Sequence, residues 1–113
     1  MDPITRQIGN LDQLLDATAM RQRVLAQNIA NVNTPGYHRQ DVSFEEHLDA
    51  SGGAANVEPQ VYEEEGLEER ADGNNVDIDH EIGALNRNAM KYQTWVQVLS
   101  SRISQMQHAI RGS

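Results

Sequence analysis

The sequence predicts a mainly α-helical protein in which two long helices, one at each end of the chain, form an antiparallel, coiled-coil-like hairpin. Apolar residues recur in steps of three and four near both ends, as in helices with one buried stripe. The stretch between them is acidic and rich in turn-forming pairs. We expect an N-terminal helix and turn over residues 1–37, a short, acidic, mostly irregular connector over 38–75, and a C-terminal helix over 76–113. The first and last segments together would form one helical domain.

The composition narrows the class of protein. Of 113 residues, 38% are hydrophobic and 4% aromatic, both low for a compact globule, so we expect the apolar stripes to be buried partly against other chains. The absence of cysteine excludes disulfides and thiolate metal sites. The net charge of −8 is concentrated in residues 41–72, which carry eleven acids and one base, and no basic patch indicates nucleic-acid binding. We also expect no membrane insertion and no cleaved signal peptide.

The N-terminal helix is predicted from Ile4 to Val32, about 45 Å long at roughly 1.5 Å per residue. Its seam alternates steps of four and three residues and includes two polar members: Ile4, Ile8, Leu11, Leu15, Thr18, Gln22, Leu25, Ile29 and Val32.

A sharp turn is expected to end this helix. Pro35 has no N–H and disfavours helical dihedrals at the residue before it, and Gly36 then favours a type II turn. Three short amides are expected to form an exposed face and to bond nearby backbone: Asn28, Asn31 and Asn33.

The connector begins with a segment expected to be helical. A short helix over residues 41–48 would bury three apolar side chains: Val42, Phe44 and Leu48. Residues 51–55 are expected to form a flexible break after it, because they include two consecutive glycines.

The rest of the connector is expected to be extended and solvated. Residues 57–62 are predicted to form one strand, which Pro59 and the acids that follow keep at an edge or in solvent. We interpret the acidic run over residues 63–69 as a solvated face rather than an ion-binding site. Residues 72–75 carry the signal of a turn.

The C-terminal helix, of about 30 residues, is predicted from the most regular repeat in the chain. Its seam is Ile82, Leu85, Ala89, Tyr92, Val96, Leu99, Ile103, Met106 and Ile110. Acids lie near its N-terminal end and bases near its C-terminal end, as the helix dipole favours. Asn88, beside the seam, is a candidate contact between chains, although a solvent-facing side chain is favoured.

No catalytic pattern emerges, so we expect no enzyme and no cofactor. The best metal-ligand candidates are Asp77, Asp79, His80 and Glu81, with His38 or His47. Carboxylates at the start of a helix are better explained as caps and dipole partners, so no metal site is assigned. Tyr37 is either an anchor at an interface or a cover for the end of the first helix, and the first is favoured.

The stretch from Leu25 to Tyr37 resembles the N-terminal signature of the axial proteins of the bacterial flagellum. In that family, a Leu-Ala-x-Asn-Ile-Ala-Asn-x-x-Thr-Pro-Gly-Tyr run closes the N-terminal helix, and this chain matches it at Asn28, Ile29, Ala30, Asn31, Thr34, Pro35, Gly36 and Tyr37. Residues 72–79 followed by Glu81 resemble the start of the C-terminal helix in rod proteins. The brief connector is most like that of the proximal rod proteins.

The resemblance implies a structural subunit of the proximal rod that assembles through its terminal helices into a helical tube transmitting motor torque. Its implied partners are copies of itself, other rod and basal-body proteins and the flagellar type III export apparatus. Its implied location is the periplasmic rod. We nominate as the assembly interface Leu11, Leu15, Leu25, Asn28, Ile29, Asn31, Val32, Thr34, Pro35, Gly36, Tyr37, Leu85, Ala89, Tyr92, Val96, Leu99, Ile103 and Met106. Two alternatives are a soluble coiled-coil dimer or adaptor, which the heptads alone equally support, and a small metal-binding domain.

Overall fold

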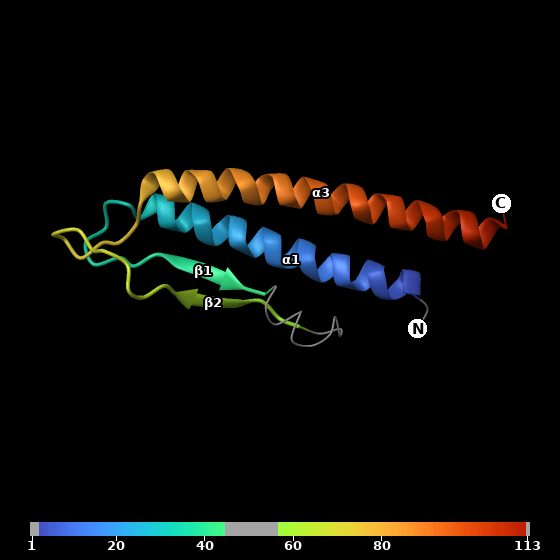
Figure 1. The fold of residues 1–113 in the computed structure, drawn as a ribbon, viewed down its shortest axis with the longest axis horizontal. Helices are drawn as coiled ribbons and strands as arrows, with labels where there is room; N and C mark the ends of the chain where they lie inside the picture. Colours follow the sequence, from blue (N-terminus) through green and yellow to red (C-terminus); the bar gives the residue numbers. More distant parts are fainter. Residues whose placement is uncertain (1–2, 45–56, 113) are drawn as a thin grey trace.

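The computed structural model describes residues 3–44 and 57–112, and it shows the expected hairpin. Helix α1 spans Pro3–Ala30 and helix α3 spans Ile78–Arg111, with strands β1 (Gln40–Ser43) and β2 (Gln60–Glu63) between them. The two helices lie side by side and antiparallel, so both ends of the chain lie at the same end of the molecule (Figure 1). The mainly helical fold class is confirmed.

The hairpin is long and thin, with extents of 65 × 25 × 14 Å. Its buried apolar side chains lie mostly on α1, where Ala17, Val24 and Leu25 are each at most 5% exposed. A body this thin has a high ratio of surface to volume, so a single copy leaves much apolar surface in water.

Helix α1 ends at Ala30, two residues before the predicted end. The Asn31 side chain donates to the Gln27 carbonyl at 2.8 Å, and so bonds backbone within its own helix as expected. The predicted turn follows: Gly36 has φ +75°, and the Tyr37 N–H donates to the Thr34 carbonyl at 3.2 Å.

The helix predicted over residues 41–48 is wrong for the part that the structure describes. Residues 40–43 form β1, which pairs antiparallel with β2 so that Val42 faces Val61. Val42 and Phe44 are 3% and 0% exposed, so the buried positions alternate with the period of two of a strand. Leu48 and the break over residues 51–55 lie outside the described residues.

Strand β2 is the outer strand of this two-stranded sheet, while β1 lies beside α1 (Figure 1). All four residues of β2 are exposed, which confirms the expectation of an edge in solvent. The strand is shorter than the predicted 57–62 and begins after Pro59, which has no N–H to donate to a ladder.

Helix α3 is 34 residues long and begins at Ile78, after Asp77 as its N-cap. The Asp77 carboxylate accepts from the N–H groups of Asp79 and His80 at 3.1 and 3.3 Å. His108 and Arg111 lie in the last turn. Both ends therefore carry the charges that the sequence predicts, and both favour the helix dipole.

The apolar stripe of α3 is only partly covered by α1. Several members of the predicted seam stay well exposed: Tyr92 at 42%, Val96 at 40%, Ile103 at 37% and Ile110 at 78%. Other members are half-buried, including Leu85, Ala89, Leu99 and Met106. One flank of the predicted seam therefore remains open along the length of the helix.

The core position Leu25 gives a first prediction. Replacing Leu25 with alanine is expected to lower the free energy of unfolding by about 2–5 kcal/mol, because this side chain is 1% exposed and its removal leaves a cavity. Leu67→Ala is the matched control: at 39% exposed it should change stability by at most about 0.5 kcal/mol. Urea unfolding followed by circular dichroism measures both, and equal losses would contradict the burial described here.

Candidate functional site

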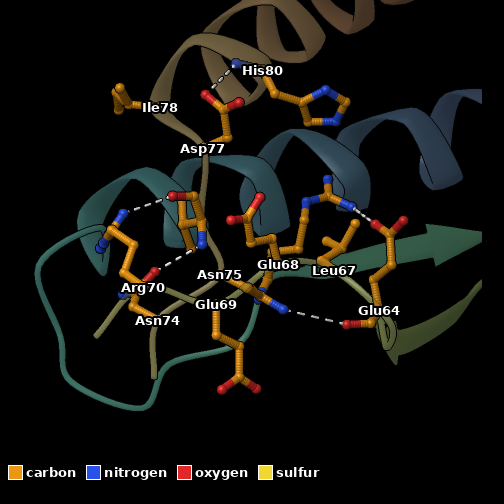
Figure 2. A pocket seen from close by; sticks show the side chains of 12 residues that line it. Glu64, Leu67, Glu68, Glu69, Arg70, Asn74, Asn75, Asp77, Ile78 and His80 are labelled. Carbon is orange, nitrogen blue, oxygen red and sulfur yellow. Dashed lines mark hydrogen bonds and ion pairs between the residues drawn. The ribbon is translucent and has the colours of Figure 1, made fainter. Parts of the chain in front are cut away.

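The end of the hairpin where the chain turns back carries a cleft with a volume of about 660 Å³. It lies between the 64–70 loop and the start of α3, and it is open to solvent (Figure 2). Its lining mixes the exposed apolar side chains of Leu67 and Ile78 with the acids Glu68 and Glu69. No convergent set of catalytic groups lies in it.

Beneath this cleft, Asn74 joins the turn after α1 to the segment that begins α3. Its side chain is fully buried and donates to the carbonyls of Asn31 and Thr34 at 2.9 and 2.8 Å. Both carbonyls belong to the turn after α1, and each also accepts a turn N–H, from Thr34 and from Tyr37. The Gly36 N–H donates to the Asp72 carbonyl at 2.8 Å. The two stretches that carry the family resemblance therefore bind each other within one chain.

The same junction needs glycine where the two backbones meet. Gly73 has φ +83°, and a Cβ at this position would lie 3.4 Å from the Cα of Gly36. The sequence predicts a turn at residues 72–75 but not this contact.

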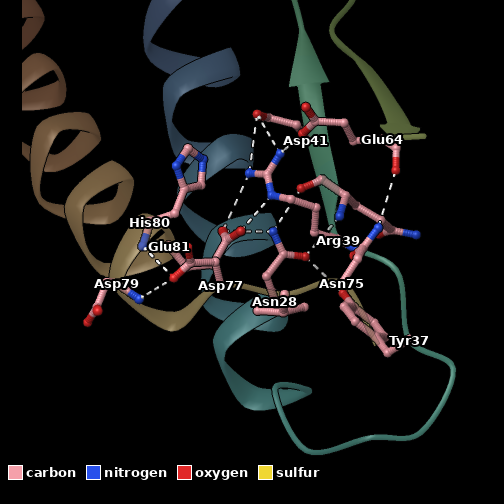
Figure 3. A network of polar contacts seen from close by, with 12 residues as sticks. Asn28, Tyr37, Arg39, Asp41, Glu64, Asn75, Asp77, Asp79, His80 and Glu81 are labelled. Carbon is pink, nitrogen blue, oxygen red and sulfur yellow. Dashed lines mark hydrogen bonds and ion pairs between the residues drawn. The ribbon is translucent and has the colours of Figure 1, made fainter. Parts of the chain in front are cut away.

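A buried polar network lies beside the junction, and we call it the elbow network: Asn28, Tyr37, Arg39, Asn75 and Glu81 (Figure 3). It joins α1, the segment before β1 and the first turn of α3. Asn75 is 8% exposed and its side-chain oxygen accepts from the Arg39 N–H at 2.6 Å. Each member of the network is held by bonds to residues distant in sequence.

Asn28 lies at the centre of this network and uses both ends of its amide. Its nitrogen donates to the Gln40 carbonyl at 2.8 Å and to Glu81 Oε2 at 3.0 Å. Its oxygen accepts from the Tyr37 hydroxyl and from the Gln40 N–H, both at 3.0 Å. Asn28 is 0% exposed, so the expectation of an exposed amide there is wrong. The side chain faces inward because it can satisfy all four bonds there.

Arg39 and Glu81 form a buried ion pair, with side chains 3% and 0% exposed. Arg39 Nε lies 2.5 Å from Glu81 Oε1, and its Nη1 also contacts the carboxylates of Glu64 and Asp41. Burial by itself lowers the pKa of Arg39, but the bonds and charges of these acids raise it overall, so the guanidinium stays charged. Because each buried charge is paired and hydrogen-bonded, the cost of desolvating both is offset.

Tyr37 covers the end of α1 by donating its hydroxyl to Asn28. Burial, and then the charge of Glu81, raise the pKa of Tyr37, while Arg39 partly opposes this. The hydroxyl therefore remains a donor at neutral pH. Of the two roles weighed for Tyr37, this contact corresponds to the second, and its role as an interface anchor stays a prediction.

A second buried amide, Asn88, joins the middles of the helices. It is 3% exposed and donates to the Thr18 carbonyl and to Gln22 Oε1, both at 2.8 Å. The favoured expectation of a solvent-facing Asn88 is therefore wrong, and its partners lie within its own chain. Two hydrogen bonds to α1 satisfy its buried amide nitrogen, one to a backbone carbonyl and one to the half-buried side chain of Gln22.

Glu81 was not predicted to be a structural partner of Arg39. The sequence treated it as a charge at the start of a helix, and also as a weak metal-ligand candidate. A signal was present: Glu81 lies four residues before Leu85 and seven before Asn88, on the face of α3 that is turned toward α1. An acid on an inward face requires a buried cation, and Arg39 supplies it.

The nominated interface residues fall into three groups by exposure. Leu11, Leu25 and Asn28 are buried within this chain. Half-buried residues are Leu15, Ile29, Asn31, Val32, Tyr37, Leu85, Ala89, Leu99 and Met106. Exposed residues are Thr34, Pro35, Gly36, Tyr92, Val96 and Ile103. The fully exposed members lie in the turn after α1 and on the open flank of α3, and the nominated interface itself stays a prediction.

The metal-ligand candidates are not brought together. Among residues 3–44 and 57–112, no group of three or more His, Asp or Glu side chains is placed to hold a metal ion. Asp77 caps α3, Glu81 binds Arg39, and His38 lies between Glu63 and Glu69 at 2.7 and 3.0 Å. His47 lies outside the described residues. Over the same described ranges, no helix has the length and apolarity needed to cross a bilayer.

Comparison with known proteins identifies relatives that share nearly the whole chain. A family model described as "Flagella basal body rod protein" matches residues 15–38, the second half of α1 and the turn after it. The flagellar basal body rod protein FlgB of Salmonella typhimurium is 30% identical over 88% of this chain and 89% of its own. The FlgB of Bacillus subtilis is 27% identical over 93% of each chain. That of Escherichia coli is 28% identical over 98% of this chain and 97% of its own.

Removing Glu81 should expose how much the hairpin depends on the elbow network. Glu81→Ala is expected to lower the free energy of unfolding by about 3 kcal/mol, because it leaves the buried Arg39 charge with only Glu64 and Asp41 at its edge. Glu68→Ala, which removes an exposed carboxylate, should change it by at most about 0.5 kcal/mol. Urea titration measures both, and a Glu81→Ala protein as stable as the control would contradict this role.

The His38 contacts predict a stability that falls as pH rises. Hydrogen bonding to Glu63 and the charges of Glu69 and Glu63 raise the pKa of His38 above its ordinary value of about 6.5, against a smaller effect of burial. The stability that protonated His38 adds to the folded protein is therefore fully present below about pH 6.5, its pKa in the unfolded chain. It is lost as the pH rises through the higher pKa of the folded state.

Unfolding of the wild type and of His38→Gln at about pH 5.5 and pH 8.5 tests this prediction. The stability difference between them should be larger at the lower pH. When Glu63→Gln is added to both proteins, the stability difference between them should depend less on pH, since the variant removes the hydrogen bond that raises the pKa of His38 most. A difference that is the same at both pH values would contradict the assignment.

Proposed function

The chain belongs to the FlgB family of flagellar basal body rod proteins, and from that premise we propose that it joins the proximal rod through the open flank of α3. It is a structural protein of the rod, not an enzyme. Membership of this family implies assembly with other basal-body rod proteins. What the family does not specify is which surface of this chain makes the contacts.

The observation that carries the proposal is the apolar flank of α3 that α1 leaves in water. We call it the α3 flank: Tyr92, Val96, Ile103 and Ile110. These residues lie at positions i, i+4, i+11 and i+18, which fall on one side of a helix. An exposed apolar stripe of this kind is typical of a surface that is buried in an assembly.

The turn after α1 supports a second part of the interface. Thr34, Pro35 and Gly36 are exposed, while the backbone behind them is fixed by Asn74. A rigid, exposed turn offers a neighbour a surface that loses little conformational entropy on binding. The turn and the α3 flank would then contact different neighbours, because they lie on different parts of the molecule.

The remaining features of the proposal follow from the family. The partners would be other rod and basal-body proteins and further copies of this chain. Repeated contacts that do not close into a ring build a helical tube, which would transmit motor torque. Delivery to the periplasmic rod by the flagellar type III export apparatus, without a cleaved signal peptide, completes the proposal.

A soluble coiled-coil dimer is the alternative that the α3 flank itself favours. Two copies that buried these flanks against each other would close a discrete four-helix assembly and leave no open apolar surface. Sedimentation separates the two: a dimer keeps one size at all concentrations, whereas a rod subunit grows into larger polymers or binds other rod proteins.

Adding charge to the α3 flank tests the proposal directly. The double variant Val96→Asp/Ile103→Asp should keep the helical circular dichroism of the wild type, because both positions are at least 37% exposed. It should fail to restore motility in a strain that lacks the native gene, since each aspartate would be desolvated in the interface.

The matched control adds the same charge one position along. Gln97→Asp/Ser104→Asp places two aspartates on exposed polar positions beside the flank, and it should restore motility. Normal motility of the Val96→Asp/Ile103→Asp strain would exclude the α3 flank as the working surface.

A further inference from the structure

A second cleft, of about 410 Å³, lies where α1, β1 and α3 meet. On its β1 side, Asp41 contacts both Arg21 and Arg39, at 3.5 and 3.4 Å. Arg87 and Lys91 stand along its α3 side, near Ala84 and Asn88. We call this cleft the basic groove.

Two of the four Arg and Lys side chains that line the basic groove lack ion-pair partners in the described part of the chain: Arg87 and Lys91. They lie four residues apart on α3, a spacing at which like charges repel. Gly83 leaves room for the first of them, since a Cβ there would lie 3.2 Å from Arg87 Nη1. An anionic occupant would relieve the repulsion.

Asn88 gives a second, independent sign that the groove is incomplete. Its Oδ1 is the one buried side-chain nitrogen or oxygen, among residues 9–44 and 57–112, with no hydrogen-bond partner. A buried acceptor without a donor costs free energy, of the order of 1–3 kcal/mol in mutational data. An occupant that brings an N–H toward Asn88 would supply the missing bond. A peptide segment with acidic side chains offers both the charge and the donor.

The chain itself carries such a segment. Glu65, Leu67 and Glu68 are exposed in the loop after β2, and Gly66 turns this loop with φ +81°. We call residues 65–68 the acidic loop. The neighbouring acids are engaged: Glu64 contacts Arg39, and Glu69 contacts His38. The two acids of the loop have no ion pair within the described residues, and they flank a leucine that is 39% exposed.

The groove and the loop match in charge and polarity. Two carboxylates would meet the two unpaired cations, Arg87 and Lys91, and the leucine would cover Ala84, one turn before them on α3. The acidic loop lines the wider cleft of its own chain, and none of its residues lines the basic groove. For the acidic loop to occupy a basic groove, the groove must therefore belong to another molecule.

We propose that the acidic loop of one copy docks into the basic groove of a second copy. The two surfaces differ, so the contact is heterologous. In a chain of copies, the copy at one end keeps a free loop and the copy at the other end keeps a free groove. This inference rests on the proposed rod function and deepens it, because it names a contact between copies that is separate from the α3 flank.

Disulfide trapping tests the contact, and because the native chain has no cysteine, only the introduced cysteines can form disulfides. Leu67→Cys and Ala84→Cys, carried on separately tagged copies, should form a mixed disulfide when they are combined and oxidised. Leu67→Cys with Ser104→Cys, an exposed position farther along α3, is the control pair and should form far less. Equal yields from the two pairs would overturn the proposal.

Charge reversal with rescue gives a second test. Arg87→Glu/Lys91→Glu and, separately, Glu65→Lys/Glu68→Lys should each weaken self-association in sedimentation by about tenfold or more, because like charges would then face each other. All four positions are exposed, so the circular dichroism should not change. A one-to-one mixture of the two variants should recover association, since the reversed charges match again.

The outcomes separate this inference from the proposed function. If the mixture stays as weak as either variant alone, or if the wild type does not self-associate, the loop–groove contact is overturned. If the acidic loop binds another rod protein instead of a second copy, the assignment of the occupant is overturned. In each case the proposed function stands as long as the charged α3 flank still abolishes motility.

Discussion

The hairpin depends on one buried ion pair, between Arg39 and Glu81. Neither charge is stable in the interior alone, so each requires the other, and together they require α3 to start beside the segment that leads into β1. The Asn28 side chain on α1 then donates to the second oxygen of the Glu81 carboxylate. Three segments that are far apart in sequence are thus fixed by one electrostatic condition. A thin, two-helix body with little apolar core gains its unique arrangement from this polar contact.

The sequence predicted the features that local rules determine. The two helices follow from apolar spacing, the turn from Pro35 and Gly36, and the start of α3 from the capping preference of Asp77. It failed where tertiary contacts decide. Residues 40–43 became a strand because α1 offers a surface that buries alternate side chains, Val42 and Phe44, and no local pattern states which surface a segment will meet.

The polar contacts of the candidate site were the least predictable part. Arg39 and Glu81 are separated by 42 residues and Asn88 lies 70 from Thr18. The helical spacing of one sequence can place Glu81 on an inward face, but it does not identify the partner that it meets there. The asparagines looked like surface groups because amides are usually exposed. What placed Asn28 and Asn88 inside is that each found acceptors already buried. In the family signature, Asn28 and Tyr37 therefore bond within the chain, while Thr34, Pro35 and Gly36 of the turn are exposed.

The two buried amides lie at different points along the hairpin, and this spacing has a mechanical consequence. A helix pair held only by an apolar seam can slip by one heptad, because the pattern repeats every seven residues. Asn28 at the elbow and Asn88 farther along each fix the axial register. A force that slides one helix along the other must break the hydrogen bonds of both amides at the same time. The hairpin therefore resists sliding of its helices along their whole shared length.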